Sequence, residues 1–248
     1  MPVPRRFLLA TLLALLGLVS AAPAPPSAHS NTWAVLVGTS KYWFNYRHNA
    51  NALSFYRTVK SLGIPDDRII LMLPEDTACT PRNPFPGHMF NSPSHELNLY
   101  DEDSVEVDYR GSEVTVESFL RLLTNRHAAN TPSSKKLLTD DTSNVLIYLS
   151  GHGGDGFLKF QDADIMSSQD LADAIGDMHT QKRYETRHIS VKSSFVYHKL
   201  YYNVDVLLLT CRIDKYAIGG FSSSISLFLG TTSSSSSSTP AKPPLSRL

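Results

Sequence analysis

The segment that most constrains the fold is residues 144–154, NVLIYLSGHGG. Its apolar run holds β-branched and aromatic residues and ends in glycines, which is typical of a buried strand in a parallel sheet. Ligands and chemistry in open α/β sheets lie at the carboxyl ends of the strands, and His152 follows directly after this run. A histidine there predicts an imidazole that works with a cysteine or serine nucleophile. The alternative is a histidine with only a structural role at a strand end.

The segments before this strand predict a βαβ unit. Residues 33–39 (WAVLVGT) and 68–73 (RIILML) have the composition of buried strands. Residues 48–62, between them, carry apolar side chains at helical spacing, and Gly63 ends that helix. Because βαβ units cross over right-handed and give parallel strands, we expect an α/β fold around a mainly parallel sheet.

The remaining elements are less regular. Residues 74–111 are rich in Pro, Asn and Asp, and loops of this length usually carry function. Residues 114–124 and 169–178 predict helices, and residues 204–210 (VDVLLLT) are a candidate fourth strand. A formal net charge of +0 gives no indication of nucleic acid as a partner.

The first 22 residues predict a secretory signal. Arg5 and Arg6 precede an apolar run over residues 7–19, and small residues follow as a cleavage site. An uncleaved anchor is the alternative, although the run is short for a membrane span. Residues 23–30 form a Pro/Ala/Ser linker. In either case we expect the chain to enter the secretory pathway.

The chain has two cysteines, Cys79 and Cys211. One internal disulfide and two separate roles are both consistent with this count. A cysteine in a secretory-pathway protein makes His152 half of a candidate Cys–His dyad, in which the imidazole takes the thiol proton. The N–H of Gly153 is then a candidate donor to the oxyanion that forms when the thiolate attacks a carbonyl.

Five segments, taken in order, carry a family resemblance. They are residues 31–51 (NTWAVLVGTSKYWFNYRHNAN), 56–76 (YRTVKSLGIPDDRIILMLPED), 78–84 (ACTPRNP), 105–123 (VEVDYRGSEVTVESFLRLL) and 143–162 (SNVLIYLSGHGGDGFLKFQD). They resemble the GPI-anchor transamidase catalytic subunits, a caspase-like, legumain-related cysteine peptidase family. The resemblance implies a caspase-like three-layer α/β sandwich, with its N-terminal part in residues 31–185 and incomplete at the C-terminal side.

The resemblance assigns roles to two residues of the candidate site. His152 matches the catalytic histidine of the family, and Asn45 matches an asparagine that the family places beside it. A short amide acceptor there would orient the imidazole. The alternative for Asn45 is a loop asparagine that caps the following helix.

The resemblance also implies a partner bond and a structural Ca²⁺, with no other cofactor required. Cys79 matches a cysteine that bridges to another subunit, while a free or internally paired Cys79 is the alternative. Asp66, Glu106 and Asp108 match acidic positions of a calcium site. Glu106 and Asp108 alternate, so they can share one face of an extended segment, but alternating acids are also typical of a solvated strand.

The resemblance ends where the nucleophile should stand. In the family a cysteine ends the strand after the helix that corresponds to residues 169–178. Here residues 186–220 diverge and residues 221–248 form a Ser/Pro-rich tail predicted to be disordered. Two interpretations remain: residues 186–203 are an insertion and Cys211 is the nucleophile, or everything after about Glu185 is foreign sequence and the nucleophile is missing.

Transamidation is the function that the resemblance implies. The enzyme would cleave the C-terminal signal of a proprotein and attach a GPI lipid, within a complex of several subunits on the lumenal side of the endoplasmic reticulum. A catalytically inactive homologue that acts at most as a binding subunit, and a legumain-type cysteine endopeptidase, are the alternatives.

Overall fold

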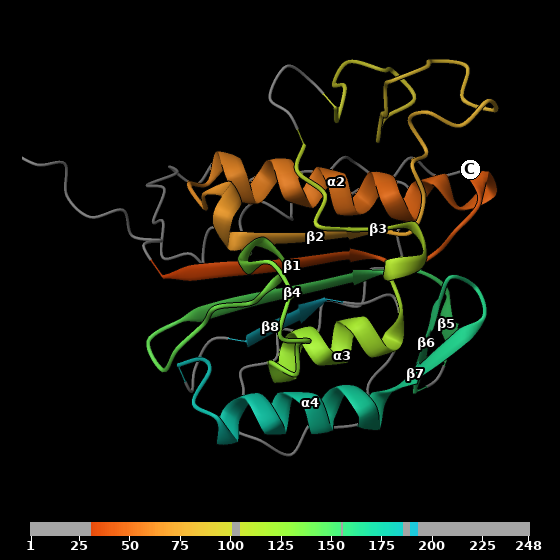
Figure 1. The fold of residues 1–248 in the computed structure, drawn as a ribbon. Helices are drawn as coiled ribbons and strands as arrows, with labels where there is room; N and C mark the ends of the chain where they lie inside the picture. The colour runs from red at the N-terminus through yellow and green to blue at the C-terminus, as the bar shows by residue number, and fades with distance from the viewer. Residues whose placement is uncertain (1–30, 101–104, 155, 186–188, 193–248) are drawn as a thin grey trace, which may run out of the picture.

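The computed structural model describes residues 31–100, 105–154, 156–185 and 189–192. Within these ranges the chain forms a three-layer sandwich, with a central sheet between one helix and a pair of helices (Figure 1). The predicted α/β class with a mainly parallel sheet is confirmed. None of the helices in these ranges is long and apolar enough to cross a membrane. The predicted signal, linker and tail, the candidate strand at residues 204–210 and Cys211 lie outside the described residues.

The central sheet has five strands in the order β3-β2-β1-β4-β8, all parallel. They are β1 (Thr32–Gly38), β2 (Ile69–Leu73), β3 (Tyr109–Arg110), β4 (Asn144–Ser150) and β8 (Ile189–Lys192). β1, β2 and β4 are near-continuous apolar runs because helices cover both faces of the sheet. Gly38 pairs with Ser150, so β1 and β4 end level with each other.

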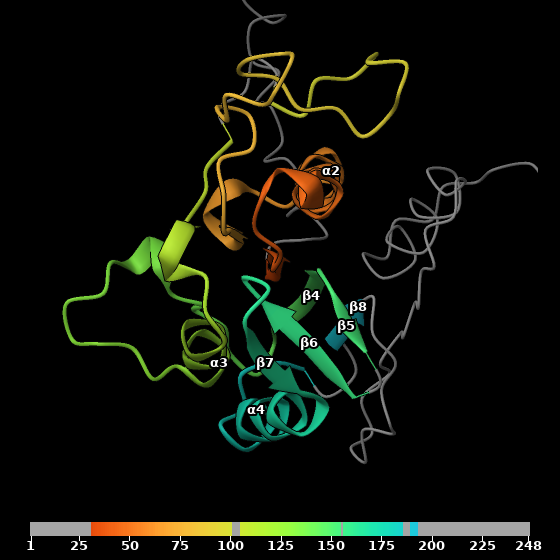
Figure 2. The same ribbon diagram turned by 90° about the vertical axis from the view of Figure 1, so that its right-hand side faces the viewer.

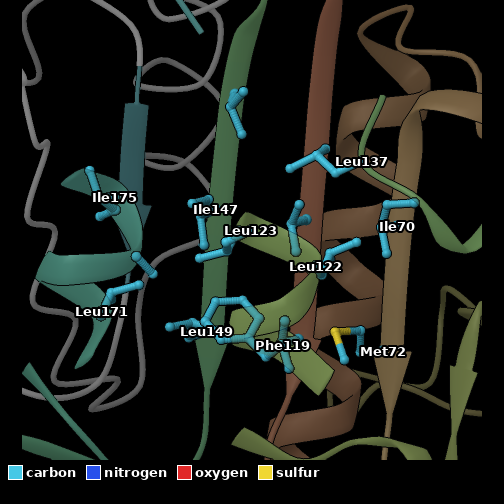
Figure 3. Close-up of a cluster of buried hydrophobic side chains, with 14 of the residues drawn as sticks. Ile70, Met72, Phe119, Leu122, Leu123, Leu137, Ile147, Leu149, Leu171 and Ile175 are labelled. Carbon is cyan, nitrogen blue, oxygen red and sulfur yellow. The ribbon is translucent and has the colours of Figure 1, made fainter. Parts of the chain in front are cut away.

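Alternate side chains of β1 enter two separate cores. Ala34 and Leu36 pack against α2 (Tyr46–Ser61) on one face. Val35 and Val37 belong to the cluster under α3 (Val116–Thr124) and α4 (Ser168–Thr180) on the other face. Figure 3 shows this second cluster, in which residues of α3 and α4 meet the sheet. The two-residue period of a strand therefore builds both layers of the sandwich.

The three helices match the predicted ones to within about two residues. α3 and α4 begin at caps: the hydroxyls of Thr115 and Ser167 accept hydrogen bonds from backbone N–H groups of the first turn. The described ranges also hold four 3₁₀ turns: Trp43–Asn45, Asp66–Arg68, Gly111–Glu113 and Ser133–Lys135.

Besides the two-residue strand β3, which falls in the segment predicted to be irregular, two parts of the structure were not predicted. One is a small antiparallel sheet of β5 (Gly153–Gly154), β6 (Phe157–Phe160) and β7 (Asp164–Ser167), in the order β5-β6-β7. It lies at the carboxyl ends of the strands, on the α4 side (Figure 2). The other is β8, which pairs with β4 although its sequence has no clear strand pattern. Both have short strands of two to four residues, which give too little periodicity to identify.

The predicted long irregular segment connects β2 to β3 and lies over α2 (Figure 1). In its described part, one isolated bridge joins Phe90 and Asn98. The buried amide of Asn83 donates to backbone carbonyls of the same segment, those of Thr77, Ala78 and His88. These hydrogen bonds give the loop a fixed course without secondary structure.

Candidate active site

The backbone around His152 is held by two neighbouring strands. The N–H of His152 donates to Ser40 Oγ (3.1 Å), just beyond the end of β1. Its carbonyl accepts from the N–H of Lys159 in β6 (2.8 Å). A Cβ atom on the preceding residue, Gly151, would lie 1.8 Å from Thr39 Oγ1, so this close approach requires glycine. These two hydrogen bonds and the close contact at Gly151 therefore fix the position of the His152 backbone, from which the imidazole extends.

Asn45 lies directly against His152. Its side-chain Oδ1 is 2.6 Å from Nε2 of the imidazole, and the residue is 0% exposed. Asn45 occupies the N-cap position of α2, yet its side chain makes no capping hydrogen bond. The structure thus favours the orienting role over the capping alternative.

The hydrogen bonds of the Asn45 amide define the tautomer of the imidazole. Its Nδ2 donates to the carbonyl of Lys41 (2.7 Å) and to Oδ2 of Asp162 (3.0 Å). Because both of these partners are acceptors, the amide oxygen must face His152. Nε2 of His152 therefore carries the proton that it donates to Asn45, and Nδ1 carries the lone pair that can accept a proton.

A second histidine, His48, packs against the first. The two rings are T-shaped with their centroids 5.0 Å apart, and His48 Nδ1 lies 3.1 Å from Ser150 Oγ. Burial, with smaller contributions from the charges of Arg47 and His152, lowers the pKa of His48 to about 3. His48 is therefore neutral at physiological pH. The sequence analysis missed it, although its position three residues after Asn45, on the same side of α2, is a usable signal.

Gly153 follows His152 as the first residue of β5 and is exposed. It pairs in register with Leu158 of β6. The role of its N–H as an oxyanion donor stays a prediction.

Cys79 is exposed in the loop between β2 and β3 and has no disulfide partner among the described residues. A hydrogen bond to Asp76, together with the negative charge of that residue, raises the pKa of the Cys79 thiol. A raised pKa disfavours the thiolate, which argues against Cys79 as a nucleophile. Exposure is compatible with the predicted disulfide to a partner, which stays a prediction.

Asp66, one of the three acids predicted to bind calcium, has partners within the protein. Its carboxylate forms an ion pair with Lys60 (2.7 Å) and accepts a hydrogen bond from the hydroxyl of Tyr56. The same hydroxyl accepts from the backbone N–H of Glu106 (3.4 Å), so it links two of the predicted calcium-site residues.

Asp108, another of the acids predicted to bind calcium, is partly buried. The pKa of Asp108 is raised to about 6, chiefly by burial; the hydrogen bond from the Leu71 N–H (2.9 Å) opposes the rise and the nearby charge of Glu106 supports it. Two carboxyl groups that repel each other in this way suit a cation, whereas Asp66 is already engaged by Lys60. In the described ranges, no group of three or more His, Cys, Asp or Glu side chains is arranged to hold a metal ion. The calcium site stays a prediction.

The predicted nucleophile, Cys211, lies outside the described residues. The neighbour of β4 on the side away from β1 is β8, and Tyr148 pairs with Lys192 in parallel register. The carboxyl end of β8 therefore lies at the same edge of the sheet as His152. β8 is the strand after α4, and in the sequence it is followed by serines rather than by a cysteine.

Comparison with known proteins identifies relatives of this chain. The sequence profile of the Peptidase C13 family matches residues 32–217. A GPI-anchor transamidase of Schizosaccharomyces pombe is 57% identical over 179 residues, which are 72% of this chain and 46% of that protein. The GPI-anchor transamidases of Saccharomyces cerevisiae and Homo sapiens are 62% and 60% identical over 158 residues, 64% of this chain and 38% and 40% of theirs. The chain thus spans less than half the length of these curated relatives.

Proposed function

Because the chain belongs to the peptidase C13 family, we propose that it acts in GPI-anchor transamidation, with His152 as its catalytic base. The observation that carries the proposal is the hydrogen bond between His152 Nε2 and Asn45 Oδ1, at the carboxyl end of a central strand. It leaves Nδ1 as the proton acceptor, which is what a cysteine nucleophile requires. The relatives named GPI-anchor transamidase supply the reaction class.

The proposed reaction has two halves. In the first, the Cys211 thiol gives its proton to His152 Nδ1, and the sulfur attacks the carbonyl at the cleavage site of a proprotein. The Gly153 N–H donates to the oxyanion. The tetrahedral intermediate collapses, the C–N bond breaks, and the C-terminal signal leaves with the proton from His152. A thioester to Cys211 remains.

In the second half the amine of a GPI lipid attacks the thioester carbonyl. It gives a proton to His152, the C–S bond breaks, and the released thiolate takes the proton back. The product is the GPI-anchored protein, and the free thiol is restored. Hydrolysis would differ only in that water attacks in place of the amine, so exclusion of water decides between transfer and proteolysis.

The proposal also covers the cellular location of the protein and its partner subunits. We place the protein on the lumenal side of the endoplasmic reticulum, within a complex of several subunits, with Cys79 as the bridge to one of them. The exposure of Cys79 supports this bond. The family match extends to residue 217 and so includes Cys211, which supports Cys211 as the candidate nucleophile, although β8 at Ile189–Lys192 holds the place in the sheet next to β4.

The test is complementation of cells that lack the transamidase catalytic subunit, with a GPI-anchored surface protein as the readout. We expect the full chain to restore surface display, and His152→Ala and Cys211→Ser to abolish the rescue. Cys79→Ser is the matched cysteine control, and it should retain rescue at a reduced level. Rescue by Cys211→Ser would show that Cys211 is not the nucleophile.

Failure of the unmodified chain to rescue, at normal expression, would refute transamidation by this chain and favour a binding role. A legumain-type endopeptidase is separated by a second measurement. The purified chain would then cleave asparagine-containing peptides when no amine acceptor is present, and we expect no such cleavage.

A further inference from the structure

Asp162 has no role in the reaction described above, yet it contacts the residue that orients the base. Its Oδ2 accepts two hydrogen bonds of 3.0 Å, one from Nδ2 of Asn45 and one from the backbone N–H of Lys41. Asp162 lies 117 residues after Asn45 in the chain, in the turn between β6 and β7. The folded structure therefore brings a carboxylate to the far side of the Asn45 amide from His152.

The carboxylate acts with the Lys41 carbonyl to set which way the Asn45 amide points. The two ends of a carboxamide have nearly the same shape, so packing alone does not select its orientation. If the Asn45 amide were flipped, its oxygen would face the carbonyl of Lys41 and the carboxylate of Asp162, which are both acceptors. The NH₂ group would then face Nε2 of His152 and favour the tautomer with the proton on Nδ1. That tautomer cannot accept the thiol proton at Nδ1.

The backbone at Asp162 supports a dedicated role. Gln161 and Asp162 have φ values of 49° and 61°, two successive left-handed residues that are not glycine. The conformation is held by hydrogen bonds from Gln161, whose N–H donates to the carbonyl of Thr39 (2.6 Å). The Gln161 side chain donates to the carbonyls of Gly111 and Val114 (3.0 and 2.9 Å). Strained backbone of this kind persists where the surrounding structure over-determines it, and it concentrates at functional sites.

We propose that Asp162 is a positioning residue: through the Asn45 amide, it selects the tautomer of His152 that can act as a base. The proposal rests on the proposed function for its catalytic meaning. The juxtaposition itself consists of one carboxylate, one buried amide and one imidazole, joined by hydrogen bonds of 3.0 and 2.6 Å. Lys41 holds the carboxylate in place through its backbone N–H, so the arrangement does not depend on a second charged side chain.

Two substitutions of Asp162 distinguish the effect of losing the hydrogen-bond acceptor from the effect of changing the backbone conformation. Asp162→Asn keeps an oxygen that can accept both hydrogen bonds, and asparagine tolerates the left-handed conformation. Asp162→Gly also suits that conformation but removes the acceptor. The matched control is Gln161→Gly, which loses two side-chain hydrogen bonds in the same turn and none to Asn45.

The measurement is ¹⁵N NMR of the full chain with labelled histidine, at a pH where the His152 ring is neutral. We expect the Nε2–H tautomer and a slowly exchanging Nε2 proton in the unmodified chain and in Asp162→Asn. In Asp162→Gly we expect a several-fold larger fraction of the Nδ1–H tautomer and at least tenfold faster exchange of the Nε2 proton. Gln161→Gly should lower the thermal midpoint and leave the ring signals unchanged.

An unchanged tautomer and exchange rate in Asp162→Gly would overturn the proposal. So would the same change in Gln161→Gly, because the effect would then come from the turn as a whole. These signals need no turnover, so their outcome is independent of whether the chain rescues anchoring. If it does rescue, Asp162→Gly should lower kcat and leave KM nearly unchanged.

Discussion

At the scale of single residues, the candidate site is a row of groups with defined protonation. Asp162 accepts from Asn45, Asn45 accepts from Nε2 of His152, and Nδ1 of His152 is left as the acceptor. His48 lies against the imidazole on another side and is kept neutral by burial. When His152 takes a proton it becomes an imidazolium, which a positively charged His48 would repel. A neutral His48 ring therefore favours proton transfer to His152.

The buried ring of His48 makes stability depend on pH. Its pKa is about 3 in the folded chain and near its ordinary value of 6.5 in the unfolded chain. Between these values the unfolded state binds more protons, so stability is fully present above pH 6.5 and is lost as pH falls toward 3. From pH 7 to pH 5 we expect this residue to remove about 2 kcal/mol of unfolding free energy.

The measurement for His48 is urea unfolding of the chain and of His48→Asn at several pH values. Asparagine can still form a hydrogen bond with Ser150 Oγ, but it does not titrate. The slope of stability against pH between 5 and 7 should therefore be shallower in the variant. The exposed His88, changed to Gln, is the control and should leave the slope as it is. Equal slopes for His48→Asn and the unmodified chain would contradict the prediction.

At the scale of the elements, the site depends on how closely the ends of β1 and β4 approach. The N–H of Thr39 donates to the carbonyl of Ser150 (2.8 Å), which extends the pairing of β1 and β4 past their last residues. Gly151 then passes so close to the Thr39 side chain that a Cβ would lie 1.8 Å from Oγ1 and 3.1 Å from Cβ. This contact fixes where His152 leaves the sheet.

We expect Gly151→Ala to destabilise the fold by about 1–3 kcal/mol, because the added methyl group overpacks a buried contact. Thr39→Ala removes the nearest atom of this contact. The Thr39 hydroxyl has no hydrogen-bond partner among the described residues, so this change alone should cost little. The double variant should be less destabilised than the sum of the two single changes, with a coupling of at least 0.5 kcal/mol in chemical unfolding. If the losses of stability in the two single variants simply added in the double variant, the contact between Gly151 and Thr39 would not limit how closely β1 and β4 approach.

The elements also show what could be predicted from sequence. The strand before His152 is continuous and apolar, so its burial and the position of the histidine follow from local pattern. The partner of His152 came from the family resemblance, because nothing local to Asn45 distinguishes it from a cap. Asp162 was missed because its role depends on the turn between β6 and β7, two strands of four residues each. β8 was missed because its place in the sheet comes from pairing with β4 rather than from its own pattern.

At the scale of the whole molecule, one buried arginine joins the layer of helices below the sheet. Arg183 follows α4 and is 5% exposed. Its guanidinium donates to the carbonyls of Leu122 and Leu123 in the last turn of α3, and to that of Leu137 in the segment before β4. Burial lowers its pKa, but a guanidinium remains charged, and the carboxyl end of a helix favours a cation.

Through these contacts Arg183 connects α3, α4 and the segment that leads into β4. We expect Arg183→Met to cost about 3 kcal/mol, since methionine fills a similar volume but leaves buried carbonyls without a donor. Arg183→Lys should recover part of the loss, because one ammonium group cannot reach all three carbonyls in the same geometry. The control is Arg121→Gln, which removes an exposed ion pair with Glu117 and should change stability by less than about 0.5 kcal/mol. The measurement is equilibrium urea unfolding of the unmodified chain and the three variants. A loss of unfolding free energy below 1 kcal/mol in Arg183→Met would show that α3 and α4 are held together by apolar packing alone.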